Sequence, residues 1–383
     1  MIQEAEFYNK ISEQLKARKA VVAYSRPGDH LVKAILQNDN KTHQLKDFNE
    51  SGFVFAPFKA DEAAYIIPSE GSEFLEFDNK DAEDIDSELF ESFPLPTDFE
   101  LMEEDQKVHE KLVQKGIDRI KAGEFQKVVL ARSEKVQVHD PDPLRIFKKL
   151  LNKYSEAFVY LWSHPETGTW LGATPETLLR SERNKFHTMA LAGTQLYKGE
   201  ENVEWGQKEV EEQAFVTDYI VESLKSLKGV ADLEVSEPYS SRAGSLLHIR
   251  TDISGKMNDA EDLGEVISSL HPTPAVCGMP KQQALQFILK NEGHEREYYS
   301  GYLGELNMKS TTHRSGNRRN QENRQFSAIS KKTELFVNLR CMKLREGQAR
   351  IYIGGGITKD SNAADEWMET VNKSQTMKAV LVK

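Results

Sequence analysis

The spacing of apolar side chains changes several times along this chain, from that of a helix face to the continuous runs of buried strands. Helical spacing predicts helices over five stretches: 3–17, 105–122, 210–227, 282–289 and 364–380. Short apolar runs predict strands over 20–24, 53–58, 127–131, 157–162, 170–173, 335–343 and 349–353. Because long helices interrupt the strands without a regular strand–helix repeat, the pattern predicts an α+β fold.

Within the predicted helix over 210–227, Phe215, Tyr219 and Ile220 form the expected apolar side. A polar stretch over 78–105, dense in Asp and Glu and containing two prolines, is typical of a solvated connection. We therefore expect an N-terminal part over 1–103, packed on or continuous with the core, and a main domain over 104–383.

A second polar stretch, residues 309–332, is basic and poor in apolar side chains. Its Ser, Asn, Gly and Gln content favours a mobile loop between two strands. A local anion site or partner site is the alternative.

Composition narrows the class of protein. The 383 residues carry 50 Lys and Arg against 61 Asp and Glu, which gives a net charge of -11. Nucleic-acid-binding surfaces are basic, so this balance argues against a nucleic-acid partner. The two cysteines lack metal-ligand spacing, no apolar run approaches the roughly 20 residues of a membrane span, and the acidic N-terminus lacks the apolar core of a signal peptide. We expect a cytoplasmic protein with no membrane partner.

Four glutamates are candidate metal ligands. Glu209 and Glu212 are three residues apart on one predicted helix, and Glu366 and Glu369 are three apart on another, so each pair shares a helix face. Two such pairs could converge on magnesium, which binds a few carboxylates and keeps water or substrate oxygens in its other positions. In a chain this rich in glutamate, spacing alone favours solvated helix faces instead.

Lys127 and Glu176 are candidate acid–base residues. Lys127 stands at the head of an apolar strand, and Glu176 lies in a turn after another strand. Burial lowers the pKa of a lysine and raises that of a glutamate, as a general base and a general acid require. A lysine with a surface-lying stem and a glutamate at a helix start are at least as common, so both interpretations stay open. The run 354–356 of three glycines lacks phosphate-loop spacing, but it would let the backbone approach a ligand closely.

Eight segments occur in a definite order along the chain: FQKVVLAR (125–132), GATPETLL (172–179), ALAGT (190–194), KEVEEQAFV (208–216), HPTPAVCGMP (271–280), EREYYSGYLGEL (295–306), LFVNLRCM (335–342) and IGGGI with EWMETVNK (353–373). Together they resemble the chorismate-utilising enzymes, which include isochorismate, anthranilate, aminodeoxychorismate and salicylate synthases. The resemblance implies a large chorismate-binding fold of twisted antiparallel sheets flanked by helices, with 104–383 as the catalytic domain.

The resemblance also implies roles for individual residues. Lys127 matches the base that activates water, and Glu176 matches the general acid. Magnesium is the implied cofactor, with two matched ligands and two nearby carboxylates: Glu212, Glu369, Glu209 and Glu366. Arg340 matches an arginine that holds a substrate carboxylate. The other matched positions line the substrate or lie near its carboxylate: Gly193, His248, Ala275, Gly354 and Lys373.

Three features favour an isochorismate synthase among the members of this family. Aminodeoxychorismate synthases carry a nucleophilic lysine where this chain has Ala192. Anthranilate synthases lack the base lysine, and the segment HPTPAV has the form typical of isochorismate synthases. The expected reaction is the reversible, magnesium-dependent addition of water at C2 of chorismate with loss of the C4 hydroxyl.

Several alternatives stay open. A salicylate synthase is the second possibility, and a catalytically silent chorismate-fold protein that binds a ligand or partner is the third. We expect no amidotransferase subunit, and either a monomer or a homodimer. Isochorismate could feed menaquinone or siderophore biosynthesis. One departure from the family is Gln213, which replaces a usual histidine.

Overall fold

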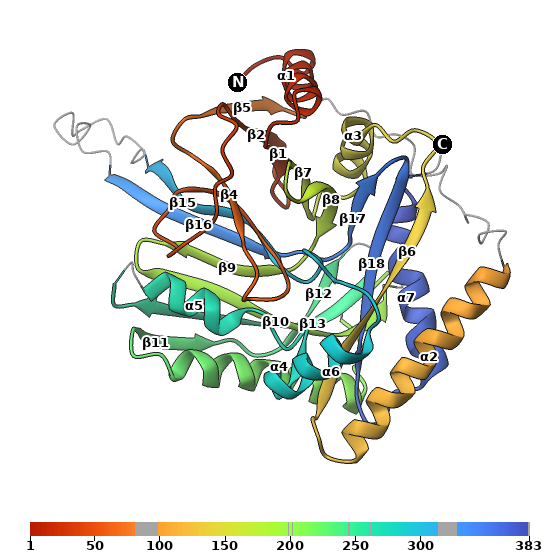
Figure 1. Cartoon of the computed structure of the whole chain (residues 1–383). Helices are drawn as coiled ribbons and strands as arrows, with labels where there is room; N and C mark the ends of the chain where they lie inside the picture. The colour runs from red at the N-terminus through yellow and green to blue at the C-terminus, as the bar shows by residue number, and fades with distance from the viewer. Residues whose placement is uncertain are drawn as a thin grey trace.

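Two large antiparallel sheets packed face to face form the core of the structure, and helices cover their outer sides (Figure 1). The structure is a computed structural model and describes residues 1–80, 99–197, 199–200, 202–243, 246–259, 262–312 and 328–381. Every strand pair within these residues is antiparallel. The predicted α+β class and the expected antiparallel sheets are confirmed.

The first sheet has the strand order β14-β6-β18-β17-β8-β7-β1-β2-β5. In this order the strands are Gly278–Met279, Lys127–Gln137, Gln348–Ile357, Cys341–Arg345, Gly168–Thr174, Phe158–His164, Val21–Ser25, Leu31–Gln37 and Ser72–Asp78. The N-terminal part of the chain therefore supplies the three strands at one end of this sheet.

The second sheet has the order β11-β13-β10-β9-β16-β15-β3-β4, and β12 pairs with β13. In this order the strands are Val230–Val235, Leu246–Met257, Lys185–Leu196, Thr177–Glu182, Ala328–Val337, Tyr302–Thr312, Gly52–Ala56 and Tyr65–Pro68, and β12 is Tyr239–Ala243. The strands β3 and β4 extend this sheet too, so the N-terminal part continues both sheets.

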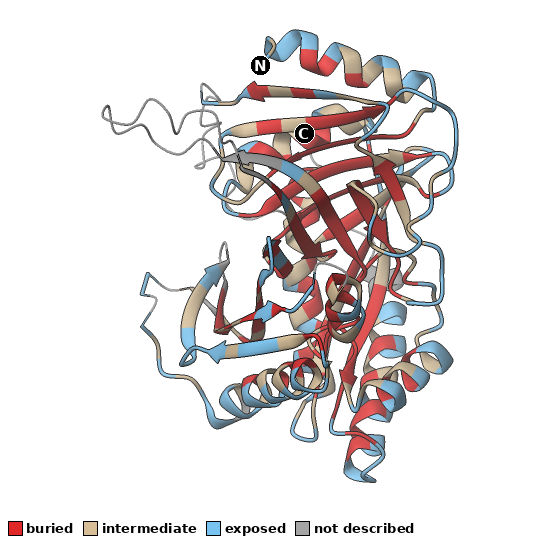
Figure 2. Ribbon diagram, turned by 90° about the vertical axis from the view of Figure 1, so that its left-hand side faces the viewer, coloured by how far each residue is buried: buried red, intermediate tan, exposed pale blue. Residues whose placement is uncertain are grey.

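Aromatic side chains fill the space between the two sheets. Figure 2 shows that much of the strand length in both sheets is buried. Phe158 on β7 stacks on Phe336 on β16 with ring centroids 4.1 Å apart, and Phe55 on β3 lies 5.0 Å from Trp162 on β7. Burying such large rings removes much apolar area from water, and aromatic pairs add a further stabilisation of about 1 kcal/mol each. This cluster joins the sheets firmly and so holds the strand ends that carry the site.

Seven helices lie within the described residues: α1 (Glu4–Lys16), α2 (Phe99–Lys121), α3 (Pro143–Lys153), α4 (Gln207–Lys225), α5 (Leu263–Leu270), α6 (Lys281–Asn291) and α7 (Ala363–Lys378). Helices α1, α3 and the end of α7 pack on the outer face of the first sheet. Helices α4 and α5 cover the second sheet, and α2 and α6 pack beside β6. The predicted boundary near residue 103 falls inside α2.

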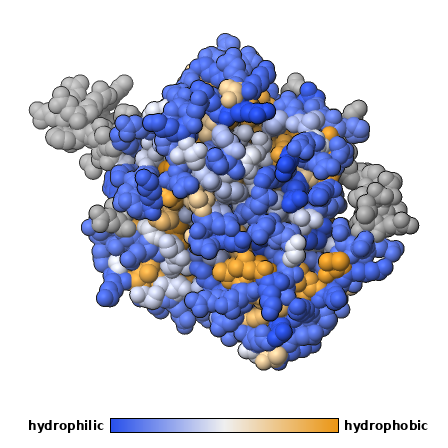
Figure 3. Space-filling model, viewed as in Figure 1, coloured by the Kyte–Doolittle hydropathy of each residue, from blue (hydrophilic) through white to orange (hydrophobic). Residues whose placement is uncertain are grey.

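The surface is mostly hydrophilic on the face shown in Figure 3, with apolar patches in its lower half. In the part of the chain that the structure describes, no helix is long and apolar enough to cross a membrane.

Two local predictions were wrong. On α4 the predicted Ile220 is buried and Tyr219 packs against the core, but Phe215 is 44% exposed. Val216 and Leu224 are buried on this side of the helix instead. The run 335–343 is not one strand, because β16 ends at Val337 in the second sheet and β17 begins at Cys341 in the first. The connecting residues cross between the sheets.

The predicted loop over 309–332 is in part ordered strand. Its first residues belong to β15 and its last to β16, which pair with each other. Residues 313–327, where the loop itself was expected, lie outside the described residues.

Candidate active site

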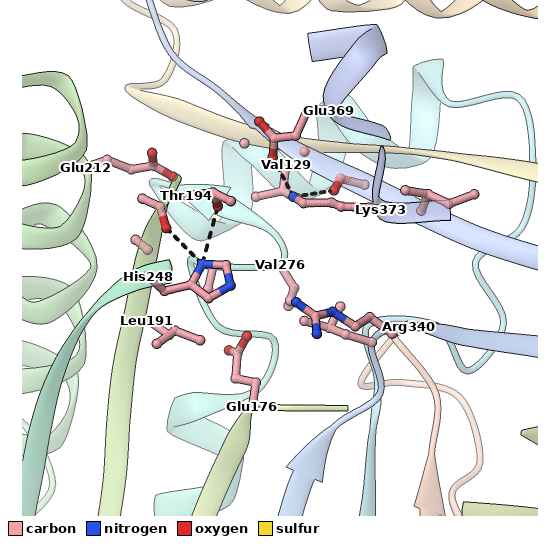
Figure 4. Close-up of a pocket in the computed structure, with 18 of the residues that line it drawn as sticks. Val129, Glu176, Leu191, Thr194, Glu212, His248, Val276, Arg340, Glu369 and Lys373 are labelled. Atoms are coloured by element: carbon pink, nitrogen blue, oxygen red, sulfur yellow. Dashed lines mark hydrogen bonds and ion pairs between the residues drawn. The ribbon is translucent and has the colours of Figure 1, made fainter. Parts of the chain in front are cut away.

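One cavity brings together residues from both sheets and from helices α4 and α7. All twelve residues singled out as site candidates line it: Lys127, Glu176, Gly193, Glu209, Glu212, His248, Ala275, Arg340, Gly354, Glu366, Glu369 and Lys373. They come from nine separate stretches of the chain and span almost 250 positions, from Lys127 to Lys373. Chance proximity is therefore a poor explanation. Figure 4 shows Glu176 and Arg340 on one side of the cavity, and Glu369 and Lys373 on the other.

Lys127, the first residue of β6, is 3% exposed. Its Nζ donates a hydrogen bond to Oε1 of Glu212 on α4 at 2.6 Å. Gly356 on β18 makes room for this contact, since a Cβ there would lie 3.0 Å from the Glu212 oxygen and 3.1 Å from Lys127 Cε. The lysine side chain is therefore buried and aimed at a carboxylate, and the interpretation of a surface-lying stem is wrong.

Glu176 lies between β8 and β9 and is buried. Its backbone carbonyl accepts a hydrogen bond from the Val337 amide at 2.9 Å, which fixes the turn against β16. Burial raises the pKa of the Glu176 carboxyl to about 7, although the positive charges of Lys127, Lys373 and Arg340 oppose the rise. The carboxyl can therefore hold a proton near neutral pH, as a general acid must.

Arg340 occupies the crossing between the two sheets. Its φ of +46° lies in the left-handed region, which is uncommon for a residue with a side chain. Its carbonyl accepts from the Ala173 amide at 3.1 Å, so β8 helps to hold this conformation. Backbone strain of this kind persists where the surrounding structure imposes it, often at a functional site. In this backbone conformation the half-buried Arg340 side chain lines the cavity.

The four candidate metal ligands lie on α4 and α7, on either side of the glycine run of β18. Glu366 is 4% exposed, whereas the other three carboxylates are partly exposed to the cavity. A Cβ at Gly355 would lie 3.4 Å from Glu366 Oε2 and 3.9 Å from Glu369 Oε1. The glycines thus leave the space beside these oxygens open.

Two of these carboxylates hold ammonium groups. Besides the Lys127–Glu212 pair, Lys373 Nζ lies 2.5 Å from Glu369 Oε1 and donates to the Gly354 carbonyl at 3.1 Å. Among the described residues, no three His, Cys, Asp or Glu side chains are already grouped as a metal site. The four carboxylates are nonetheless the type of ligand that magnesium binds, because their oxygens are hard donors. Two of them already attract cationic side chains.

His248 on β13 presents one ring nitrogen to the cavity. Its Nδ1 lies 2.9 Å from the Gly193 carbonyl and 3.3 Å from Thr194 Oγ1. A carbonyl only accepts, so Nδ1 carries the proton and the other nitrogen is left as an acceptor. Burial lowers the pKa of His248 to about 4, which keeps the ring neutral.

Sequence reasoning missed several residues of the cavity wall: Val129, Pro175, Leu191, Thr194, Val276, Tyr299, Leu339 and Tyr352. Val129 could have been found, because it lies two residues after Lys127 and so on the same side of a strand. Tyr299 lies in the segment EREYYSG but carried no spacing signal. Gln213 does not line this cavity; it donates to Thr251 Oγ1 at 2.5 Å and ties α4 to β13.

Comparisons with known proteins identify the family and the fold. A sequence family described as "Chorismate binding enzyme" matches residues 74–317, and a second of the same description matches residues 326–379. The chain is 28% identical over 280 residues to the salicylate biosynthesis isochorismate synthase of Pseudomonas aeruginosa, covering 71% of this chain and 54% of that protein. It is 32% identical over 219 residues to isochorismate synthase EntC of Escherichia coli, covering 55% and 50%.

The chain therefore spans about half the length of these two relatives. The crystal structure of the putative 2,3-dihydroxybenzoate-specific isochorismate synthase DhbC from Bacillus anthracis superimposes with a TM-score of 0.72. That alignment covers 97% of this chain and 98% of the other at 22% identity, which establishes a shared fold.

Proposed function

The chain belongs to the family of chorismate binding enzymes, and on that premise we propose that it is an isochorismate synthase. In this reaction water adds at C2 of chorismate, the double bond shifts, and the C4 hydroxyl leaves as water. One water enters and one departs, so the reaction conserves atoms and is reversible.

One observation carries the proposal: Lys127 at the start of β6 and Glu176 in the turn between β8 and β9 are both buried and line the same cavity. Lys127 is bonded to Glu212, and Figure 4 places Glu212 and Glu176 on opposite sides of the cavity. A ring bound between them would offer one end to the base and the other to the acid. Displacement of a hydroxyl by water requires such an arrangement.

The two groups act in complementary protonation states. Lys127, neutral when it acts, takes a proton from the water that attacks C2. Glu176, protonated when it acts, gives its proton to the departing C4 hydroxyl. The raised pKa of the Glu176 carboxyl supports this role, because an ionised carboxylate has no proton to donate.

The protein carries a net charge of -11, but cationic side chains line the cavity where the anionic substrate would bind. Arg340 and Lys373 line the cavity and can pair with the two carboxylates of chorismate. Magnesium bound by Glu212 and Glu369, with Glu209 and Glu366 beside them, would supply positive charge for the ring carboxylate. His248 and Gly193 also line the cavity.

The test is incubation of the purified protein with chorismate, with and without Mg²⁺, and chromatographic separation of the products. Isochorismate formed only with Mg²⁺ is the expected result. Salicylate with pyruvate would assign a salicylate synthase instead, and no turnover would leave a silent chorismate-fold protein. Ammonia should have no effect on the product, because we propose no amidotransferase subunit and no aminated product. A cytoplasmic location and a monomer or homodimer belong to the same proposal.

A further inference from the structure

Arg296, in the turn between α6 and β15, is a buried charged residue outside the cavity. It is 3% exposed, and its guanidinium lies over the Phe58 ring, 4.3 Å from the centroid. Nη1 donates to the Val276 carbonyl at 2.8 Å, and Nη2 donates to the Val129 carbonyl at 2.7 Å. One side chain thus joins the backbones of two segments that are almost 150 residues apart.

Glu292, at the end of α6, supplies the counter-charge. Its Oε2 accepts from Arg296 Nε at 2.7 Å, and its Oε1 accepts from Arg296 Nη2. The same Oε1 accepts from the Ala131 amide at 2.8 Å. The Arg296–Glu292 pair therefore holds β6 at two successive points on its backbone.

Both tethered segments form the wall of the candidate active site. Val129 and Val276 line the cavity, and Figure 4 labels both there. Lys127 lies two residues before Val129 and projects from the same side of β6. The Val129 amide also donates to the Cys277 carbonyl at 2.9 Å, so the two segments are already neighbours.

We propose that Arg296 is a positioning residue for Lys127: it locks β6 onto the 271–280 segment and thereby sets where the base stands relative to the bound ring. This proposal rests on the proposed function. The position of Lys127 matters for the rate, because an error of about 1 Å in the position of a reacting group can lower the rate about a hundredfold.

Three variants separate positioning from mere stability. Arg296→Met leaves the Glu292 charge buried and unpaired, which should destabilise the protein strongly. The double variant Arg296→Met with Glu292→Gln removes both charges, and the glutamine oxygen can still accept from the Ala131 amide. Arg296→Lys keeps the charge but not the fork that reaches both carbonyls. A matched control removes an exposed pair, Lys256→Met with Asp232→Asn.

The double variant should regain most of the melting temperature lost in Arg296→Met, yet keep a kcat at least about tenfold below wild type. Its KM for chorismate should stay within about threefold, because Arg340 and Lys373 are untouched. Arg296→Lys should recover part of the rate, and the control should match wild type. A double variant with both wild-type stability and wild-type kcat would overturn the proposal.

Hydrogen exchange distinguishes this outcome from failure of the proposed function. Peptides that contain residues 128–131 should exchange faster in the double variant than in wild type, whether or not chorismate turns over. If wild type leaves chorismate unchanged, the proposed function fails. Unchanged exchange on β6 in the double variant would refute the positioning role by itself.

Discussion

Replacing Glu176 with glutamine should make the protein more stable at high pH while it removes activity. Burial raises the pKa of this carboxyl from 4.5 to about 7. A raised pKa means that the native state binds the proton more tightly than the unfolded chain does. The carboxyl therefore contributes its full stability below pH 4.5, and this contribution is lost as the pH rises through about 7.

The size of the effect follows from the shift. Each pKa unit corresponds to about 1.4 kcal/mol, so the shift from 4.5 to about 7 amounts to about 3 kcal/mol. Glutamine resembles the protonated carboxyl in shape and lacks the charge. Glu176→Gln and wild type should thus be about equally stable near pH 4.5, and the variant should be more stable by up to about 3 kcal/mol above pH 8.

Urea unfolding at a series of pH values, followed by the fluorescence of the buried Trp162 and Trp170, measures this difference. The exposed Glu166→Gln is the matched control and should show no such trend. The rate of chorismate consumption should fall at least about a hundredfold in Glu176→Gln. In wild type it should decline as the pH rises above about 7. A stability difference that does not change with pH would refute the reasoning, because the carboxyl would then be ionised in the native state too.

Three further substitutions test the other groups of the site. Lys127→Met should lower kcat at least about a hundredfold with the circular dichroism spectrum unchanged. Near-normal turnover in this variant would show that Lys127 is not the base. Glu369→Gln should raise the Mg²⁺ concentration for half-maximal rate at least about tenfold, and calorimetric titration should show the same loss of Mg²⁺ affinity. An unchanged Mg²⁺ requirement would count against Glu369 as a ligand. Gly356→Ala adds a Cβ 3.0 Å from Glu212 Oε1 and 3.1 Å from Lys127 Cε. It should lower kcat about tenfold with a change in unfolding free energy below about 1 kcal/mol, and a wild-type rate would show that the pair tolerates displacement.

Local sequence was sufficient for the long elements. The predicted helices over 3–17 and 364–380 correspond to α1 and α7, and the run from Lys127 is the start of β6. Periodicity works there because one face of each element is buried against a layer along its whole length. On α4 periodicity placed Ile220 correctly and Phe215 wrongly. Phe215 and Val216 are both apolar, and only packing decides which of them faces the sheet.

The crossing at Arg340 was beyond sequence pattern. The segment LFVNLRCM has the apolar continuity of one strand, yet it leaves one sheet at Val337 and enters the other at Cys341. Hydrogen bonding to different neighbours, not propensity, ends the first strand and begins the second. The same crossing creates the positive φ that carries the arginine into the cavity.

By itself the sequence determined the chemical inventory of this protein: the identity and order of its ionisable groups, the glycine run between two glutamate-bearing helices, and the segments that identify its relatives. Only the tertiary structure decided what those groups can do. The raised pKa of Glu176 and the 2.6 Å contact of Lys127 with Glu212 exist because distant strands and helices bury them in one cavity. Desolvation and Coulomb energy depend on neighbours in space, and no local pattern contains them.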